Sequence, residues 1–246
     1  MKTIILKCFL FLCLVETISY GQEKKNTIRY NATNPLIFGI ENVIIGYERV
    51  LGNNQTFSVD AGFNQLPSLK PRSFTTENAR LSLNNSKKNS GFHFSFDYRF
   101  YLKTENKYNA PRGIYIGPYY SYNSFKKSND WTLNSNNFNG NLDTDLKLDI
   151  HTLGVEMGYQ FLISERFAID IIFLGPGIGR YKVAADLNTS LNLNDREFIL
   201  ENLNDLIAKK IPGYNIAVGS ENFKTNGKLD TNKLGYRFMI NLGYRF

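Results

Sequence analysis

Few side chains in this sequence combine the residue types and the spacing that catalysis needs. His93 and Ser95 are two residues apart, so on an extended strand they share a face, where a histidine can activate a serine for acyl transfer. The other histidine, His151, lies far along the chain, and two histidines without further ligands do not make a metal site. The glycine-rich GPGIGR at 175–180 precedes no helical pattern, so it does not predict a phosphate-binding loop. We therefore expect no metal or other cofactor, and only one candidate catalytic pair.

The stretch around this pair predicts the element that positions it. In GFHFSFDYRFYLK, 91–103, bulky apolar residues alternate with mostly polar ones, which predicts a β-strand. The apolar row runs from Phe92 to Leu102, and the other row contains Asp97 and Arg99 together with the candidate pair. Because the apolar row is unbroken, that face of the strand must contact an apolar medium, which is either lipid or a protein core.

The same alternation recurs along the chain and predicts eight strands. Short links alternate with long ones at 66–90, 125–144 and 186–233, which is typical of an up-and-down membrane barrel. An even strand number places both termini at the end of the short links, the periplasmic side. In the sixth segment the apolar positions change parity near His151, which predicts a β-bulge there. The predicted strands are Thr27–Leu36, Asn42–Leu51, Gln55–Asn64, 91–103, Gly113–Ser124, Leu148–Ile163, Phe167–Tyr181 and Leu234–Phe246.

The last long link predicts a helix at 194–213. Asn194 as N-cap and Glu197 three residues later form a capping box, and Pro212-Gly213 ends the pattern. The helix has one apolar stripe, which could dock on a partner or on lipid headgroups; packing against the loop or the barrel rim is the interpretation we favour. The stripe consists of Phe198, Ile199, Leu203, Leu206, Ile207 and Ile211.

The N-terminal segment 1–21 has the features of a secretory signal peptide: two lysines, a short apolar run and small residues at its end. We expect cleavage after Gly21, which leaves 22–246 as one barrel domain. Both cysteines, Cys8 and Cys13, leave with the signal, so a disulfide framework is excluded. The formal charge falls from +7 to about +6 with scattered basic residues, which indicates anionic surfaces such as lipopolysaccharide rather than nucleic acid.

Alternation alone does not separate a soluble lipocalin-like barrel, apolar inside, from a membrane barrel, apolar outside. The polar rows are rich in glycine, as the narrow lumen of an eight-stranded barrel requires. They also balance acids with arginines, which suits a buried network of ion pairs. We expect this lumen network to comprise Arg29, Glu48, Asp60, Asp97, Arg99, Glu156, Asp170, Arg180, Arg237 and Arg245.

The last segment favours the membrane barrel as well. GYRFMINLGYRF ends the chain on an apolar row whose Tyr244 and Phe246 resemble the C-terminal signal that the outer-membrane barrel insertion machinery reads. We therefore expect the row from Phe92 to Leu102 to contact lipid, and Asp97 to point into a packed lumen.

The chain resembles an uncharacterised family of small bacterial outer-membrane β-barrel proteins, similar in outline to OmpA/OmpX-type eight-stranded barrels. The resemblance covers nearly all of the chain after the signal peptide, implies the barrel and its location, and brings no activity. It is carried by NPLIFGIENVIIGYERVL at Asn34–Leu51, YIGPYY at Tyr115–Tyr120, LGPGIGRY at Leu174–Tyr181 and the GYRF end.

These patterns predict an all-β, eight-stranded antiparallel up-and-down transmembrane barrel in the outer membrane of a Gram-negative cell, with long extracellular loops, one of which carries a helix. A lumen just wide enough for side chains leaves no room for bulk diffusion, although a narrow porin-like leak stays open as an alternative. We expect that the protein is not an enzyme and that it has a structural or surface-interaction role through its extracellular loops. The expected partners are outer-membrane lipid, lipopolysaccharide and, during biogenesis, the insertion machinery.

Two other functions remain open at this point. The spacing of His93 and Ser95 is similar to that in outer-membrane lipid A deacylases, which suggests a lipid-modifying enzyme, but both residues lie on the polar row, away from an acyl chain. The second alternative is a soluble periplasmic ligand-binding barrel. Membrane extraction separates it from the membrane barrel.

Overall fold

The computed structural model describes residues 24–66, 73–210, 223 and 227–246. The predicted signal peptide, 1–21, and its cleavage after Gly21 lie outside the described residues. The described elements are β1 (Asn26–Asn31), α2 (Thr33–Phe38), β2 (Val43–Gly52), β3 (Gln55–Phe63), β4 (Ser73–Thr75), β5 (Ala79–Tyr101), β6 (Gly113–Ser135), β7 (Asn139–Leu162), β8 (Phe167–Leu174), β9 (Pro176–Leu187), α3 (Leu193–Lys210), β10 (Lys228–Tyr236) and β11 (Met239–Arg245).

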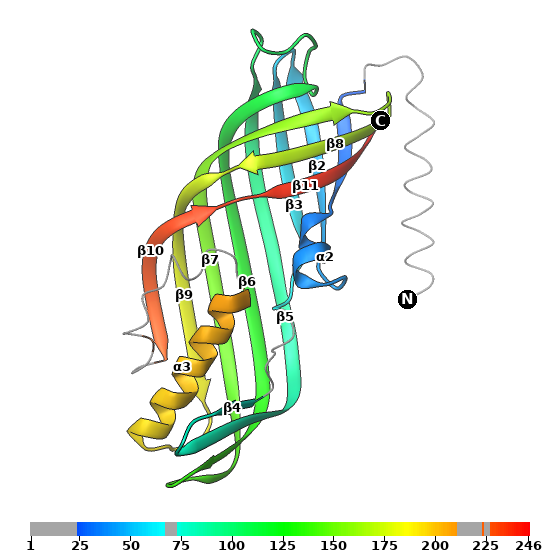
Figure 1. The fold of residues 1–246 in the computed structure, drawn as a ribbon. Helices are drawn as coiled ribbons and strands as arrows, with labels where there is room; N and C mark the ends of the chain where they lie inside the picture. Colours follow the sequence, from blue (N-terminus) through cyan, green and yellow to red (C-terminus); the bar gives the residue numbers. More distant parts are fainter. Residues whose placement is uncertain (1–23, 67–72, 211–222, 224–226) are drawn as a thin grey trace, which may run out of the picture.

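The strands form one antiparallel, 11-stranded sheet, most of which closes into a ring (Figure 1). β1 pairs with both β2 and β11, β11 pairs with β8, and β8 pairs with β7. The circuit returns to β2 through β6, β5 and β3. The prediction of an all-β fold built from one antiparallel sheet is confirmed.

Five strands continue past the ring on one side and form an open sheet, which we call the outer sheet. It consists of β10, β9 and the far parts of β7, β6 and β5, in that order, and the short β4 pairs with the far part of β5 (Figure 1). β5, β6 and β7 are 23, 23 and 24 residues long, so the expectation of irregular loops over 66–90 and 125–144 is wrong for most of these residues. On the opposite side the wall ends early, where α2 joins β1 to β2 (Figure 1).

β7 explains why the outer sheet escaped prediction. Its even-numbered residues form the inward row along the whole strand and most of them are buried, and β6 pairs with it without a shift of register. In the ring the inward residues include Glu156 and Gln160, while Leu153 and Val155 are exposed on the outside. In the outer sheet the inward residues are apolar and the outward ones are polar. The inward set there is Leu142, Leu146, Leu148 and Ile150, and the outward set is Asp143, Asp145, Lys147 and Asp149.

The predicted bulge near His151 is therefore wrong. The strand keeps its parity there, and what changes is the polarity of the surroundings on each side of the sheet. When only the positions of apolar residues are considered, this exchange of polar and apolar faces looks the same as a shift of register. The register shift on this strand lies instead between Met157 and Gly158, where it faces β8.

Helix α3 packs the described part of its apolar stripe against the inward face of the outer sheet, which residues predicted as loops form. The side chain of Leu206 and residue Ile211 lie outside the described part of the chain. Ile199, Leu203 and Ile207 are at most 3% exposed and belong to the same buried cluster as Trp131 and Leu148. Removing apolar surface from water stabilises a fold by about 25 cal/mol per Å², so the burial of these side chains holds the helix on the sheet.

The N-cap of α3 is Asn192, not the predicted Asn194. The Asn192 side chain accepts a hydrogen bond from the backbone N–H of Asp195 at 2.8 Å and donates one to its carboxylate at 2.9 Å. The helix begins at Leu193, two residues before the start that an N-cap at Asn194 requires. The predicted end at 211–213 lies outside the described residues.

Candidate functional site: the charge cluster inside the ring

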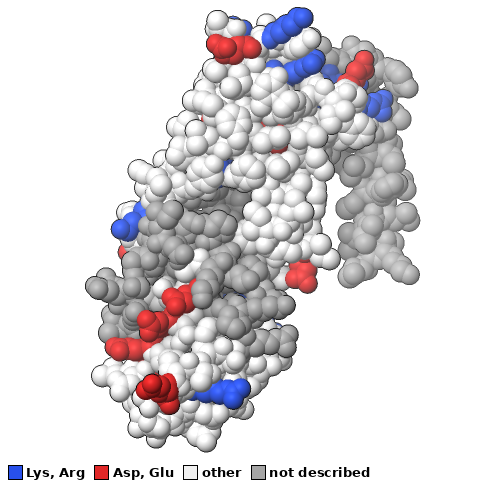
Figure 2. Space-filling model, viewed as in Figure 1, with Lys and Arg blue, Asp and Glu red and all other residues white. Residues whose placement is uncertain are grey.

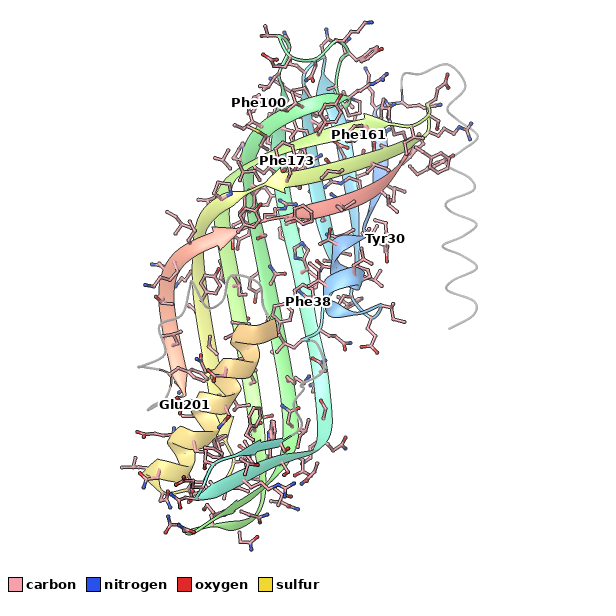
Figure 3. All side chains as sticks on the ribbon, in the orientation of Figure 1. Tyr30, Phe38, Phe100, Phe161, Phe173 and Glu201 are labelled. Carbon is pink, nitrogen blue, oxygen red and sulfur yellow. The ribbon has the colours of Figure 1, made fainter. Side chains whose placement is uncertain are left out.

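The outside of the ring is apolar. Phe100, Phe161 and Phe173 project outward from the wall of the ring and are 41%, 46% and 41% exposed (Figure 3). On the face drawn in Figure 2, charged side chains gather toward the two ends and the wall between them is nearly free of them. Further outward apolar residues of the ring are Ile28, Tyr30, Val43, Ile45, Phe57, Phe92, Phe96, Leu153, Val155, Phe167 and Leu242.

The inside of the ring, which we call the lumen, holds a cluster of buried charged side chains. Each member comes from the inward row of its strand or, for Arg237, from the link between β10 and β11, and none is more than 6% exposed. The cluster consists of Arg29, Glu48, Asp60, Asp97, Arg99, Glu156, Asp170 and Arg237.

Arg29 and Arg99 hold the cluster together across the ring. Arg29 donates from the one nitrogen Nη2 to both carboxylate oxygens of Asp60, at 2.9 and 2.8 Å, and from Nη1 to Asp170 at 3.4 Å. Arg99 Nη2 lies 3.0 Å from Asp170 Oδ2, and Nη1 lies 3.5 Å from Glu48 Oε1. Its Nε also donates to Asp97. Together the two guanidinium groups cross-link strands on opposite sides of the lumen.

Arg237 completes the network on the side of the outer sheet. Its Nη1 lies 3.1 Å from Glu156 Oε2, and its Nη2 lies 3.6 Å from Asp60 Oδ2. Neither oxygen of Glu156 accepts a hydrogen bond of good geometry from a described residue, so this contact is an ion pair without alignment. The five carboxyl groups of the cluster exceed its three guanidinium groups by two, and the excess is buried where charge is costly.

Tyrosines and glycines fill the rest of this layer. The Tyr115 hydroxyl donates to Asp170 Oδ1 at 2.6 Å, and the Arg99 guanidinium lies over the Tyr115 ring, 4.4 Å from its centre. A Cβ atom at Gly158 would lie 2.5 Å from Cζ of Tyr115, so only glycine leaves room for that ring. Sequence reasoning did not assign Tyr115 to the network, although it lies on the inward row of its strand.

Two predicted members lie elsewhere. Arg180 is half exposed on the outside of the outer sheet, where it donates to Asp230 at 2.8 and 2.9 Å. The prediction is wrong because even residues point inward in β8 but odd ones do so in β9, after the break at Gly175. Arg245 also lies outside the cluster: it is only partly buried at the rim and donates to the carbonyl oxygens of Lys24 and Glu165. Arg245 continues the inward row of β11, but it stands at the end of that row, beyond the acidic side chains of the cluster.

His93 and Ser95, the candidate catalytic pair, lie within hydrogen-bond distance of each other but are buried. His93 Nε2 lies 3.2 Å from Ser95 Oγ, and its Nδ1 lies 2.8 Å from Asn123 Oδ1. The Ser95 hydroxyl donates to Asp60 at 3.3 Å, and His93 and Ser95 are 6% and 0% exposed. The pair points into the lumen, so it has no contact with the apolar outside where an acyl chain would lie.

The C-terminal strand closes the ring at the rim. Phe246 donates its backbone N–H to Asn26 at 2.9 Å and accepts from the N–H of that residue at 3.3 Å. Tyr244 packs edge-on against Phe167, with ring centres 5.6 Å apart. The role of Tyr244 and Phe246 as an insertion signal stays a prediction.

Over the described ranges, no group of three His, Cys, Asp or Glu side chains is arranged to hold a metal ion. None of the helices in the described part of the chain has the length and apolar character to cross a membrane.

Comparisons with known proteins give a family and a distant structural likeness. A family model described as "Protein of unknown function (DUF3575)" matches residues 7–188. Among curated proteins, none matches the chain. A major outer membrane protein from Thermus thermophilus is similar over 90% of this chain and 98% of that chain, with 10% sequence identity and a TM-score of 0.40. At that level the likeness carries no argument of its own.

Proposed function

Since the chain belongs to the DUF3575 family, a family of proteins of unknown function, we propose a function from its structure. The protein is an integral outer-membrane β-barrel with a sealed lumen, and it presents the outer sheet and α3 at the cell surface. Its role is structural or one of surface interaction, without catalysis.

The reversal along β7 is the observation that carries this proposal. Within one unbroken strand, the outward row changes from Leu153, Val155 and Phe161 to Asp145 and Asp149, while the inward row changes in the opposite sense. A water-soluble barrel needs polar outward residues along its whole length. The reversal is what a strand needs when one part faces lipid and the other faces water.

We count eight spans in the ring. β8 and β9 are separated only by Gly175, and β10 and β11 only by Arg237 and Phe238, so we take each pair as one continuous strand. With β1, β2, β3, β5, β6 and β7 this makes an eight-stranded up-and-down barrel whose short links and termini are periplasmic. The size agrees with a lumen filled by side chains. Buried ion pairs and packed tyrosines such as Tyr101 and Tyr115 occupy that space, which supports a closed barrel rather than a diffusion pore.

The absence of catalysis is part of the proposal. His93 and Ser95 have the distances of a base and nucleophile, but Ser95 is fully buried and bonded to Asp60. An acyl transferase or hydrolase needs its serine within reach of the scissile bond. We assign His93, Asn123 and Ser95 to polar packing that fills the lumen above the charge cluster.

Cell fractionation followed by a heat-modifiability gel tests the proposal. The expected result is protein in the outer-membrane fraction that migrates as a compact species without boiling and as an extended one after boiling. Replacement of His93 by Ala should leave the lipid composition of the membrane unchanged. Protein recovered in the soluble periplasmic fraction would refute the membrane assignment, and a changed lipid acylation pattern would refute the absence of catalysis.

A further inference from the structure

The pairing of β5, β6, β7, β9 and β10 aligns their outward residues in rows that cross the wall. The row Phe96, Tyr120, Leu153, Ile178 and Leu234 is wholly apolar or aromatic. The next three rows toward the outer sheet are Phe94, Tyr122, His151, Arg180 and Asn232; then Phe92, Ser124, Asp149, Lys182 and Asp230; then Ser90, Lys126, Lys147, Ala184 and Lys228.

Cations predominate in these three rows. They contain five lysines and arginines against Asp149 and Asp230, and all five are exposed. We call the five the basic belt: Lys126, Lys147, Arg180, Lys182 and Lys228. In the rows beyond it the sign reverses, with acidic Asp130, Asp143, Asp145 and Asp186 on the outward face. Two exposed lysines also lie beyond the belt, Lys88 in the row of Asp145 and Lys87 bound to Asp143, but the four acids outnumber them. The net positive charge is therefore concentrated in a narrow band next to the apolar wall.

The acids within the belt neutralise only part of it. Asp149 lies 2.9 Å from Lys147, and Asp230 binds Arg180 and lies 4.0 Å from Lys182. Although partial burial opposes it, hydrogen bonds from Ser124 and Lys147 keep the pKa of Asp149 below its usual value. Lys126 and Lys228 make no ion pair with any residue in the described part of the chain.

Lys126 and Lys147 are directly opposed across the β6–β7 ladder. Like charges in that position repel, because the Cβ atoms of directly opposed residues are only about 5 Å apart. Lys182 lies diagonally from Lys147, roughly 7–8 Å away by the geometry of such pairs. An anion held between these ammonium groups turns the repulsion into attraction, and the flexible stems let the groups converge on it.

The position of the belt identifies the anion. Successive outward residues on a strand are about 6.8 Å apart, so the belt begins within one residue pair of the apolar row. If the apolar wall lies in the hydrocarbon, this is the depth of the lipid headgroups. Among the described residues, the opposite wall carries no such row of cations at its end, where α2 exposes Leu36 and Ile37 instead.

We propose that the basic belt binds the phosphate groups of a phosphorylated lipid of the outer leaflet, with Lys126 and Lys147 closing on one phosphate from neighbouring strands. This inference rests on the proposed membrane location. It adds a one-sided lipid site, centred on β6, β7 and β9, to the proposed barrel.

The test measures lipid binding to the purified protein in dodecylmaltoside micelles by native mass spectrometry. The probe is bisphosphorylated lipid A, compared with the same lipid A after removal of both phosphates. The variant K126Q/K147Q/K182Q removes three belt cations. The matched control K87Q/K88Q/K103Q also removes three lysines, two at the far part of β5 and one at the opposite rim. The heat-modifiability gel establishes first that each variant is folded.

The belt variant should bind bisphosphorylated lipid A at least about tenfold more weakly than the wild type, since each cation near an anionic lipid contributes to binding. The control should bind like the wild type, and K126R/K147R should retain binding because it keeps both charges. Dephosphorylated lipid A should bind the wild type and the belt variant equally. Equal binding of the phosphorylated probe to wild type and belt variant would overturn the lipid site, and so would loss of affinity in the control. Either result in protein that is heat-modifiable and membrane-bound would leave the proposed function standing.

Discussion

Replacing Arg99 with leucine should destabilise the barrel more than any single change at its surface. The guanidinium lies within 3.5 Å of Asp170, Glu48 and Glu156 and donates to Asp97, and it is fully buried. Without it, five buried carboxyl groups face two arginines. Removing one partner from a buried ion pair costs about 3–5 kcal/mol, because the remaining charge has lost its compensation.

The assay is equilibrium unfolding in micelles, followed by the far-ultraviolet circular dichroism of the strands as urea is raised. With a slope of about 2 kcal/mol per molar urea, the loss lowers the midpoint by roughly 2 M. If the variant does not accumulate in membranes, it can be refolded into micelles from urea. Adding Asp170→Asn to Arg99→Leu should recover part of the loss, because Asp170 Oδ2 lies 3.0 Å from the missing Nη2.

Arg180→Leu is the matched control. This arginine also pairs with an aspartate, but both side chains are about half exposed on the outer sheet, so its midpoint should not change. An Arg99→Leu midpoint equal to that of the wild type would refute the account of the lumen. A loss in Arg180→Leu as large as that in Arg99→Leu would refute it as well.

Three further changes test other parts of the structure by the same unfolding assay. Glu156→Gln should leave the midpoint unchanged or raise it, because neither carboxylate oxygen accepts a good hydrogen bond and acids already exceed arginines; a fall as large as that of Arg99→Leu would contradict this. Gly158→Val should cost about 1–3 kcal/mol, since its side chain overlaps a lumen tyrosine, whereas Gly140→Val, which has only ordinary contacts, should not. Ile199→Ala should cost the outer core about 2–5 kcal/mol, seen as an earlier change of Trp131 fluorescence, while the ring remains heat-modifiable. Loss of heat modifiability would show that α3 holds the ring itself.

The ring was predictable because its information is local. A period of two gives the strand, and a row such as that of Asp97 and Arg99 gives the face without knowledge of any partner. The inward charges from six strands and one link then had to meet, since a narrow ring offers them the same small space. What the pattern did not reveal was the pairing, for example that Arg29 binds both carboxylate oxygens of Asp60.

The outer sheet was missed for a physical reason. Its strands place Leu146 and Leu148 inward and Asp145 and Lys147 outward, so the alternation there is that of any water-exposed sheet over a core. Next to the opposite alternation of the ring, this alternation looks like a break in the pattern of one strand, and the apolar positions alone therefore predict a loop and a bulge. Arg180 was misplaced for a related reason: the parity change across Gly175 depends on how β8 faces β7, a contact that the local sequence does not encode.

The central claim is that the wall of the ring faces lipid and the outer sheet faces water. Spin labels at single cysteines along the outward row of β7 measure this directly in reconstituted liposomes, because the described residues include no cysteine. Labels at positions 145 and 149 should collide with a water-soluble nickel chelate, and labels at 153, 155 and 161 with oxygen dissolved in lipid. A crossover between 149 and 153 is the predicted result. Accessibility to the nickel chelate along the entire row would contradict the membrane barrel.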